Sequence, residues 1–237
     1  MKTAISVKNV FKTYPNGKIA LHGINIDLEY GSLVGLIGPN GAGKSTLIHI
    51  IAGVIKHDKG TIDCHIPDSK EIAWVSQFSC IDWYLPVIDN VRLGARLGGY
   101  GLSEAEEVSK KWLTTLELQH KSYCKPDALS GGEQRRMQIA RALAQNAKIL
   151  ILDEPTTGLD PIASKILMQS LKQLSKQNCL IILSSHDLHL IENDVDRILF
   201  LNEGSLIANL EIESIKRSAN NLHEYYTNTM SKTSNVT

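Results

Sequence analysis

The segment Leu33-Val34-Gly35-Leu36-Ile37-Gly38-Pro39-Asn40-Gly41-Ala42-Gly43-Lys44-Ser45 is the most informative stretch of this 237-residue sequence. Its first five residues form a continuous apolar run, which is typical of a strand buried on both faces of a parallel sheet. The next eight match the pattern Gly-x-x-x-x-Gly-Lys-Ser/Thr, and a helical stretch from Lys44 to Ile55 follows. The order strand, glycine loop, helix predicts backbone amides that hold phosphate groups at a helix N-terminus.

Two side chains of this loop have predicted roles toward the phosphates. Lys44 is expected to reach the β- and γ-phosphates as a point charge, and Ser45 is expected to offer its hydroxyl to Mg²⁺. The alternative is a glycine turn without a ligand, which the flanking strand and helix disfavour. The loop therefore predicts a phosphate site that also takes Mg²⁺.

Two further apolar runs end in polar residues. Ile149–Leu152 is followed by Asp153 and Glu154, and Leu180–Leu183 is followed by Ser184-Ser185-His186. A carboxylate such as Asp153 at a strand end can hold magnesium directly or through water. Glu154 could orient or deprotonate the water that attacks the γ-phosphate. The alternatives are a turn residue for Asp153 and a solvated surface carboxylate for Glu154.

A second glycine loop, Leu129-Ser130-Gly131-Gly132-Glu133-Gln134, precedes another helical stretch. A glycine loop at a helix N-terminus suits an anion. Taken alone, however, Ser-Gly-Gly is also an ordinary turn and helix N-cap. The sequence of this loop leaves both interpretations open.

The apolar patterns predict an α/β fold. Residues 4–10 and 18–28 alternate apolar and polar side chains, which predicts two half-buried strands in an antiparallel layer. Helical stretches separate the continuous apolar runs, which indicates a mostly parallel sheet with ligands at the carboxyl ends of its strands.

Residues 78–146 have a different character and predict an inserted helical subdomain. Pro86 is expected in a first helical turn, and Ser103–Glu106 reads as a capping box that opens a helix. That helix is expected to turn Val108, Trp112 and Leu116 inward. From Glu213 onward the chain is polar, and a last helix with a frayed tail is expected.

Composition narrows the class of protein. Lys and Arg number 25, as do Asp and Glu, so no net charge draws the chain to nucleic acid, and no nucleic-acid partner is expected. No apolar run nears the roughly 18 residues of a membrane helix, and the first residues do not resemble a signal peptide. The four cysteines lie far apart without a Cys-x-x-Cys pair, which favours free cytosolic thiols.

The motifs, taken in order, resemble those of the ATP-binding cassette (ABC) ATPases, the nucleotide-binding subunits of ABC transporters. The resemblance covers roughly residues 4–210 and rests on Gly38–Ser45, Gln77, Leu129–Gln134, Ile149–Glu154, Gly158–Asp160 and His186. It implies a P-loop NTPase (RecA-like) α/β core with a mostly parallel sheet, an antiparallel β layer and an inserted α-helical subdomain. The implied domain spans 1–212, with the core in 1–77 and 147–212, the helical subdomain in 78–146, and a C-terminal helix and flexible tail in 213–237.

The resemblance also implies a role for each residue that matches a family motif. The implied catalytic residues are Lys44, Gln77, Glu154 and His186. The implied ATP-binding residues are Tyr14, Gly38, Asn40, Gly41, Gly43, Lys44, Ser45, Thr46, Ser130 and Gly132. The implied Mg²⁺ set is Ser45, Gln77 and Asp153. By resemblance, Tyr14 stacks on adenine, Gln77 links the γ-phosphate and magnesium to the helical subdomain, and His186 contacts the γ-phosphate. The alternatives are a packed strand aromatic, a loop amide and a helix-start histidine.

In this family two cassettes meet head to tail, and the loop Ser130–Gly132 of one closes the phosphate site of the other. Asp160 is then expected at the dimer seam, although Asp160-Pro161 is also a good helix start. The implied partners are a second ABC subunit, expected as a homodimer, and a polytopic transmembrane permease. The implied location is the cytoplasmic face of the cell membrane.

Coupling to the permease is expected at an apolar loop that includes Phe78, Ile81, Trp83, Tyr84 and Leu85, because exposed apolar patches mark partner sites. The alternative is that these residues fill the core of the helical subdomain. Export is favoured over import by the resemblance of residues 82–90 to an exporter-type loop. A soluble, non-transport ABC ATPase is the second hypothesis for the function, and a small-molecule kinase is the third.

Overall fold

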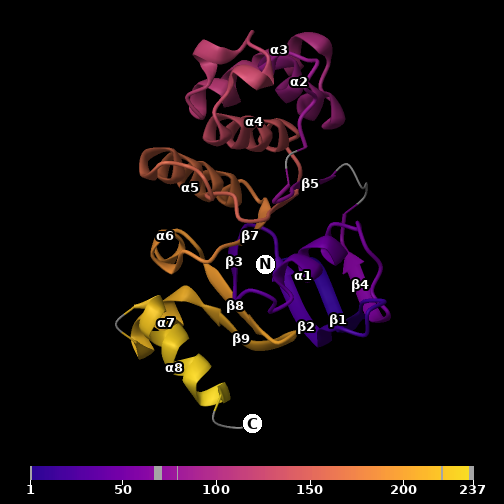
Figure 1. Ribbon diagram of the computed structural model, residues 1–237, viewed down its shortest axis with the longest axis vertical. Helices are drawn as coiled ribbons and strands as arrows, with labels where there is room; N and C mark the ends of the chain where they lie inside the picture. Colours follow the sequence, from indigo (N-terminus) through magenta and orange to yellow (C-terminus); the bar gives the residue numbers. More distant parts are fainter. Residues whose placement is uncertain (1, 67–70, 79, 220, 235–237) are drawn as a thin grey trace.

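The computed structural model describes residues 2–66, 71–78, 80–219 and 221–234, and it has the α/β architecture that the sequence predicts (Figure 1). The strands are β1 (Thr3–Thr13), β2 (Ile19–Glu29), β3 (Leu33–Ile37), β4 (Lys59–Cys64), β5 (Ile72–Val75), β6 (Ile149–Leu152), β7 (Leu180–Ser184), β8 (Arg197–Asn202) and β9 (Ser205–Glu211). The α-helices are α1 (Lys44–Ile51), α2 (Val87–Leu97), α3 (Leu102–Thr115), α4 (Gly131–Ala144), α5 (Pro161–Lys176), α6 (Leu188–Glu192), α7 (Ile212–Ser218) and α8 (Leu222–Ser234).

A six-stranded sheet forms the centre of the molecule. Its order is β5-β6-β7-β3-β8-β9, and every neighbouring pair is parallel except β8 and β9. All five residues of β3 are buried, with Leu33 and Ile37 in one apolar core and Val34 and Leu36 in the other. The apolar runs therefore form strands buried on both faces, as predicted, and their carboxyl ends lie at one edge of the sheet.

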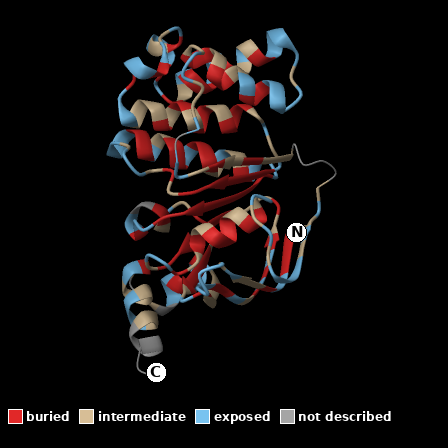
Figure 2. Cartoon of the chain, turned by 45° about the vertical axis from the view of Figure 1, so that its right-hand side comes forward, coloured by how far each residue is buried: buried red, intermediate tan, exposed pale blue. Residues whose placement is uncertain are grey.

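A smaller antiparallel sheet, in the order β2-β1-β4, packs over α1 and the central sheet (Figure 1). Val7 pairs with Ile26 on one side and with Ile62 on the other. The two strands expected at 4–10 and 18–28 are confirmed: β1 is longer than expected at both ends, and β2 is shifted by one residue. Figure 2 shows the buried residues concentrated on the strands and on the helix faces turned toward them.

Helix α1 ends earlier than the predicted Ile55. It stops at Ile51, and Gly53 follows with φ 74°, its N–H donating to the carbonyl of Ile50 at 3.0 Å. A left-handed glycine just past the last turn is a common helix C-terminus, because glycine adopts this conformation without steric cost. Local chain geometry thus overrides the apolar pattern that suggested a longer helix.

Helices α2, α3 and α4 form a separate helical layer beyond β5 (Figure 1). Trp112 and Leu116 are buried as predicted, and Val108 packs half-buried against the same core. The capping box predicted at Ser103–Glu106 is wrong. The N-cap of α3 is Gly101, whose N–H donates to Glu104 Oε2 at 3.0 Å, because Glu104 is the third helical residue. Pro86 is likewise the N-cap of α2 rather than a residue of its first turn.

Helices α2 and α4 approach each other most closely at Gly94. A Cβ atom built on Gly94 would lie 1.8 Å from the carbonyl oxygen of Arg141. We expect Gly94→Ala to lower the free energy of unfolding by about 1–3 kcal/mol, because the helices must separate to admit the methyl group. Urea unfolding measures this loss. Gly131→Ala is the control, since a Cβ there meets open space, and equal losses in the two variants would contradict the expectation.

The C-terminal region forms two helices rather than the single helix predicted from Glu213. Helix α7 begins at Ile212, and the extended backbone of Ala219 (φ −147°) separates it from α8. Tyr225 and Tyr226 of α8 pack their rings against Phe200, with centroids 5.9 and 5.6 Å away. Residues 235–237 of the predicted tail lie outside the described residues.

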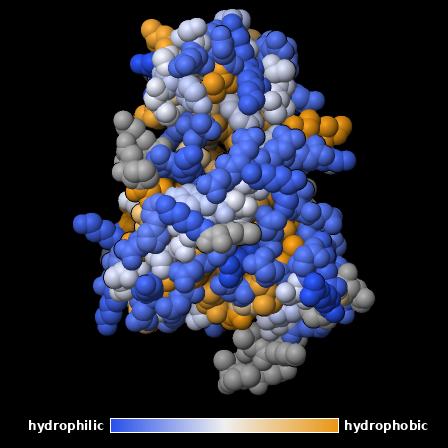
Figure 3. All heavy atoms as spheres, turned by 180° about the vertical axis from the view of Figure 1, so that it is seen from behind, coloured by the Kyte–Doolittle hydropathy of each residue, from blue (hydrophilic) through white to orange (hydrophobic). Residues whose placement is uncertain are grey.

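Seen from behind, the surface is mostly hydrophilic, with separate hydrophobic patches (Figure 3). Across the described residues 2–66, 71–78, 80–219 and 221–234, no helix combines the length and the apolar character that a membrane span requires.

Candidate active site

The glycine loop between β3 and α1 has the backbone conformation that a phosphate cradle requires. Gly43 has φ 102°, and a Cβ atom on it would lie 2.5 Å from the carbonyl oxygen of Ala20. Gly38 is equally confined, since a Cβ there would lie 2.1 Å from the carbonyl oxygen of Leu201. Only glycine fits these two positions, and the loop can then turn successive N–H groups toward one anion.

A cavity of about 210 Å³ lies over this loop and brings most of the predicted site residues together. It is lined by Tyr14, Lys18, Ala20, Asn40, Gly41, Gly43, Lys44, Ser45, Thr46, Gln77, Asp153 and Glu154. These residues come from the segment after β1, the start of β2, the glycine loop, the first turn of α1, the segment after β5 and the segment after β6. The cavity lies where the carboxyl ends of parallel strands meet, which is the usual ligand position in such sheets.

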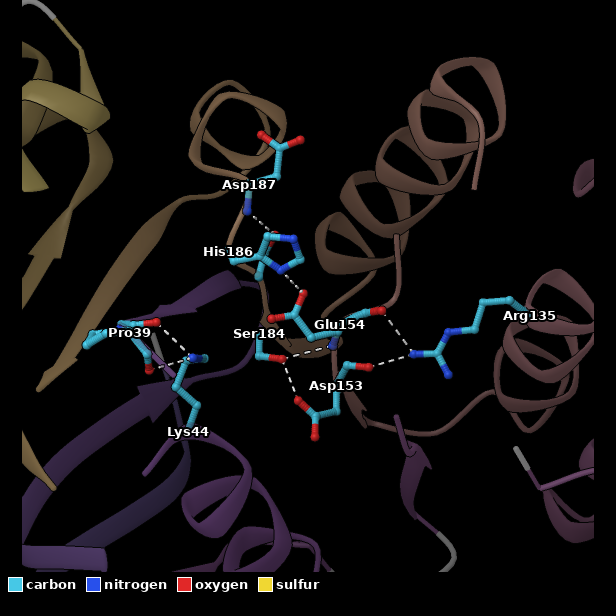
Figure 4. A network of polar contacts seen from close by, with 10 residues as sticks. Pro39, Lys44, Arg135, Asp153, Glu154, Ser184, His186 and Asp187 are labelled. Carbon is cyan, nitrogen blue, oxygen red and sulfur yellow. Dashed lines mark hydrogen bonds and ion pairs between the residues drawn. The ribbon is translucent and has the colours of Figure 1, made fainter. Parts of the chain in front are cut away.

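Lys44 is buried, with 8% of its surface exposed, at the first position of α1. Its Nζ donates to the carbonyl oxygens of Gly38 at 2.8 Å and Pro39 at 3.1 Å (Figure 4). Desolvation lowers the pKa of the Lys44 ammonium, while the nearby charges of Glu154 and Asp153 raise it. The loop thus holds a positive charge at the floor of the cavity, next to two carboxylates.

Asp153 and Glu154 are held by the neighbouring strand. The hydroxyl of Ser184, at the end of β7, donates to Asp153 Oδ1 at 2.6 Å and accepts the N–H of Glu154 at 2.9 Å (Figure 4). Asp153 is 2% exposed. Glu154 has φ 49°, a left-handed conformation that non-glycine residues adopt only when their surroundings enforce it. The end of β7 therefore fixes the carboxylate of Asp153 and the backbone of Glu154.

His186 lies against Glu154. Its Nδ1 is 2.8 Å from Glu154 Oε2, and the imidazole is 71% exposed while the glutamate side chain is 13% exposed. The two side chains come from different strand ends, as Figure 4 shows. This geometry suits a glutamate that accepts a proton from a water molecule and a histidine that orients it.

Tyr14 and Gln77 both line the cavity. The hydroxyl of Tyr14 lies 3.2 Å from Thr46 Oγ1, which ties the segment after β1 to the first turn of α1. Gln77 is exposed in the segment that leads from β5 to the helical layer. The positions of these residues are compatible with the adenine and γ-phosphate contacts predicted for them, which stay predictions.

Ser130 and Gly132 do not line the cavity of their own chain. Ser130 is the N-cap of α4, since its Oγ accepts the N–H of Glu133 at 3.3 Å and its own N–H donates to Glu133 Oε2 at 2.8 Å. Asp160 is likewise the N-cap of α5, and the N–H groups of Ala163 and Ile162 lower the pKa of its carboxyl. The helix-cap interpretations of both residues are therefore correct for the single chain. Contacts across a dimer stay predictions.

The donors present fit Mg²⁺ held jointly with a nucleotide. The Ser45 hydroxyl and the Asp153 carboxylate lie on the same cavity. The described part of the chain holds no group of three His, Cys, Asp or Glu side chains placed to bind a metal. Mg²⁺ commonly takes only one or two protein oxygens and completes its shell with phosphate oxygens and water. An oxygen pair beside a phosphate loop suits that ion.

Comparison with known protein families shows which family this chain belongs to. The family described as "ABC transporter" matches residues 21–157. This chain belongs to the ABC transporter ATP-binding family. The resemblance inferred from its motifs is confirmed, as are its fold and its class as an ABC ATPase, the ATP-binding subunit of a transporter.

Relatives of this ABC ATPase work in different directions. It is 34% identical over 212 residues to the Nod factor export ATP-binding protein I of Burkholderia orbicola, covering 86% of this chain and 69% of the relative. It is also 34% identical over 224 residues to the phosphonates import ATP-binding protein PhnC of Thiobacillus denitrificans, covering 86% of each. Membership of the family therefore does not fix the direction of transport.

A solved relative supports the nucleotide chemistry. The dimeric structure of a post-hydrolysis state of the ATP-binding cassette MJ0796, bound to ADP and Pi, is 30% identical to this ABC ATPase. The TM-score is 0.80, and the match covers 88% of this chain and 98% of that one. Binding of ATP follows from the family, while the residues that carry it here stay predictions.

Two residues that hold Asp153 and Glu154 in place, Ser184 and Arg135, are not predicted as site residues from the sequence. The sequence predicts Ser184 only as a polar residue at a strand end, although a serine beside the strand that carries Asp153 is itself a signal. No sequence pattern points to Arg135 of α4, because its partners are the backbone carbonyls of Ser76 and Asp153.

Proposed function

We propose that this ABC ATPase acts as a homodimer at the cytoplasmic face of a membrane and drives a separate polytopic permease, in the direction of export. The division into a core (1–77 and 147–212), a helical subdomain (78–146) and a C-terminal element (213–237) belongs to the same proposal. The position of Ser130 at the N-cap of α4 supports the homodimer. The loop Ser130–Gly132 does not line the cavity of its own chain, so it is available to the cavity of a second copy. The solved dimeric relative supports the same assembly.

In this proposal ATP occupies the cavity over the glycine loop. Lys44 and the loop amides bind the β- and γ-phosphates, Ser45 and Asp153 hold Mg²⁺, and Glu154 accepts a proton from the attacking water. Mg²⁺ supplies neutralisation of the phosphate charge when bound. His186 contacts the γ-phosphate in this proposal, and the 2.8 Å distance between its Nδ1 and Glu154 Oε2 supports a role beside the base.

The observation that carries the permease partner is a groove of about 710 Å³ between the apolar loop and the helical layer. Trp83 and Tyr84 line it and are 48% and 88% exposed, while Leu97 of α2 and Arg141 of α4 line its other side. Ile81 packs against the apolar core, as the alternative interpretation expected, but the two aromatic residues do not. Exposed aromatic side chains in a groove suit a helix of a partner protein.

Export rests on resemblance alone. Residues 82–90 are similar to an exporter-type loop, and the Nod factor export protein shows that such relatives exist at this level of identity. The permease that accompanies the ABC ATPase is the direct test of direction, since its own fold distinguishes exporters from importers.

The test is ATP-dependent co-purification from detergent-solubilised native membranes, with tagged Glu154→Gln protein as bait. We expect a polytopic membrane protein to accompany the bait, and Trp83→Ala added to that bait to reduce its recovery about tenfold, because truncating a groove aromatic removes much of the docking contact. Tyr123→Ala is the matched control, since Tyr123 is 75% exposed and does not line the groove. A soluble partner or a ribosome would instead support the non-transport ABC ATPases.

A further inference from the structure

Arg135 is a buried cation that reaches from the helical layer to the catalytic strand ends. It lies on α4 and is 8% exposed. Its Nη1 donates to the carbonyl oxygen of Ser76 at 2.6 Å. Its Nη2 donates to the carbonyl oxygens of Asp153 at 2.5 Å and Glu154 at 3.1 Å (Figure 4). One guanidinium thus joins three backbone groups from two strand ends.

These three carbonyls lie at the positions where the chain must be held most precisely. Ser76 immediately precedes Gln77, and Asp153 and Glu154 are the two carboxylates of the cavity. Glu154 keeps a left-handed backbone with φ 49°. Its N–H is held by Ser184, and its carbonyl is held by Arg135. A non-glycine residue stays in this conformation only where contacts on both sides impose it.

The chemistry of arginine suits this position and that of lysine does not. Burial lowers the pKa of the Arg135 guanidinium through desolvation, while the charges of Asp153 and Glu154 raise it, and arginine stays protonated in proteins. Its planar fork donates in several directions at once, whereas a lysine ammonium is a compact point charge. Removing the fork takes a donor from the carbonyl oxygens of Ser76 and Asp153, which is costly, while the carbonyl oxygen of Glu154 keeps the N–H of Thr157 at 3.3 Å.

We propose that Arg135 is a positioning residue, which holds the backbone of Glu154 and of the residue before Gln77 against α4 and so keeps the base aimed at the attacking water. The inference rests on the proposed role of Glu154. It adds a physical link between the helical layer and the base, carried by one side chain.

The test compares steady-state ATP hydrolysis by full-length Arg135→Met, Arg135→Lys and Arg135→Gln proteins. We expect Arg135→Met to lower kcat about 10–100-fold with KM for ATP within about threefold, because residues that orient reactive groups act on the chemical step. Arg135→Lys should recover part of the loss, since it restores a charge but not the fork. A partly unfolded population would also lower apparent kcat at an unchanged KM, so kcat is calculated per ATP-binding molecule, and a loss that disappears on this basis would point to a role in folding alone.

Arg136→Met is the matched control, because it removes the same charge from the next position of α4. Its guanidinium contacts the carbonyl oxygen of Leu116 and the carboxylate of Glu117, both within the helical layer. We expect kcat of this variant within about twofold of the parent, as is usual for pairs of this kind. Equal losses in the two arginine variants would overturn the positioning role.

A double variant ties the effect to Glu154. In single-turnover hydrolysis of radiolabelled ATP, Arg135→Met added to Glu154→Gln should cost no further rate, since residues that act through one group are not additive. If the rate losses of Arg135→Met and Glu154→Gln multiply in the double variant, the inference is overturned. If Arg135→Met fails to fold, parental kcat in both Arg135→Lys and Arg135→Gln overturns it instead. Parental turnover by Glu154→Gln alone would overturn both the assignment of Glu154 as the base and the positioning role of Arg135. Slow turnover by Glu154→Gln together with parental turnover by the Arg135 variants would overturn only the positioning role of Arg135.

Discussion

Glu154→Gln is expected to lower ATP turnover about 10²–10⁴-fold, the range typical of removing a general base. Glutamine keeps the size of the side chain, and the backbone contacts to Ser184 are independent of the substitution. The amide cannot accept a proton from water, so hydrolysis stops while ATP binding persists. ATP-driven dimers should therefore accumulate, which light scattering on a size-exclusion column measures beside phosphate release.

Glu203→Gln is the matched control for this variant. Glu203 is also a glutamate with a left-handed backbone, φ 47°, but it is exposed and does not line the cavity. Its replacement tests whether loss of a carboxylate at such a backbone position is enough to slow the enzyme. Parental turnover in both variants would show that the base is another group.

Lys44→Ala is expected to weaken ATP binding about 10–100-fold, since a charged hydrogen bond contributes about 1.5–3 kcal/mol. The ammonium is the cation held at the floor of the cavity by the carbonyls of Gly38 and Pro39, and alanine removes it. Titration calorimetry with a non-hydrolysable ATP analogue measures the change in Kd. Lys59→Ala is the control, because Lys59 is exposed on β4 and lies outside the cavity. Unchanged affinity in Lys44→Ala would exclude the assigned phosphate contact.

The sequence predicted the centre of the fold well, for a physical reason. Continuous apolar runs such as Leu180–Leu183 occur where a strand is covered on both faces, and the polar residues that follow them must then meet at one edge. The cavity accordingly gathers the glycine loop, Asp153 and Glu154. The strands β4, β5, β8 and β9 were not predicted. β4 and β9 are only partly buried and their patterns are weak, whereas β8 has a buried apolar run of the same kind as the predicted strands.

The ends of helices were predicted less well, because they depend on local chain geometry. Gly53 stops α1, Gly101 starts α3 and Ala219 separates α7 from α8, and none of these residues changes the apolar pattern. The Ser184 and Arg135 contacts depend on strand order and on backbone groups. Such contacts become visible only when the chain is folded.

The close approach of α2 and α4 has a mechanical consequence. Gly98, one turn beyond Gly94, is also confined, since a Cβ there would lie 2.1 Å from the carbonyl oxygen of Gln145. Two backbones in contact along a whole turn cannot slide past each other, so the pair behaves as a rigid body. Any swing of this body must occur at hinges in the two connections to the sheet, around Ser76 and Ala147. Arg135 of this body is bonded to the carbonyl oxygens of Ser76, in the first of these connections, and of Glu154, so a swing of the body would strain the contact that holds Glu154.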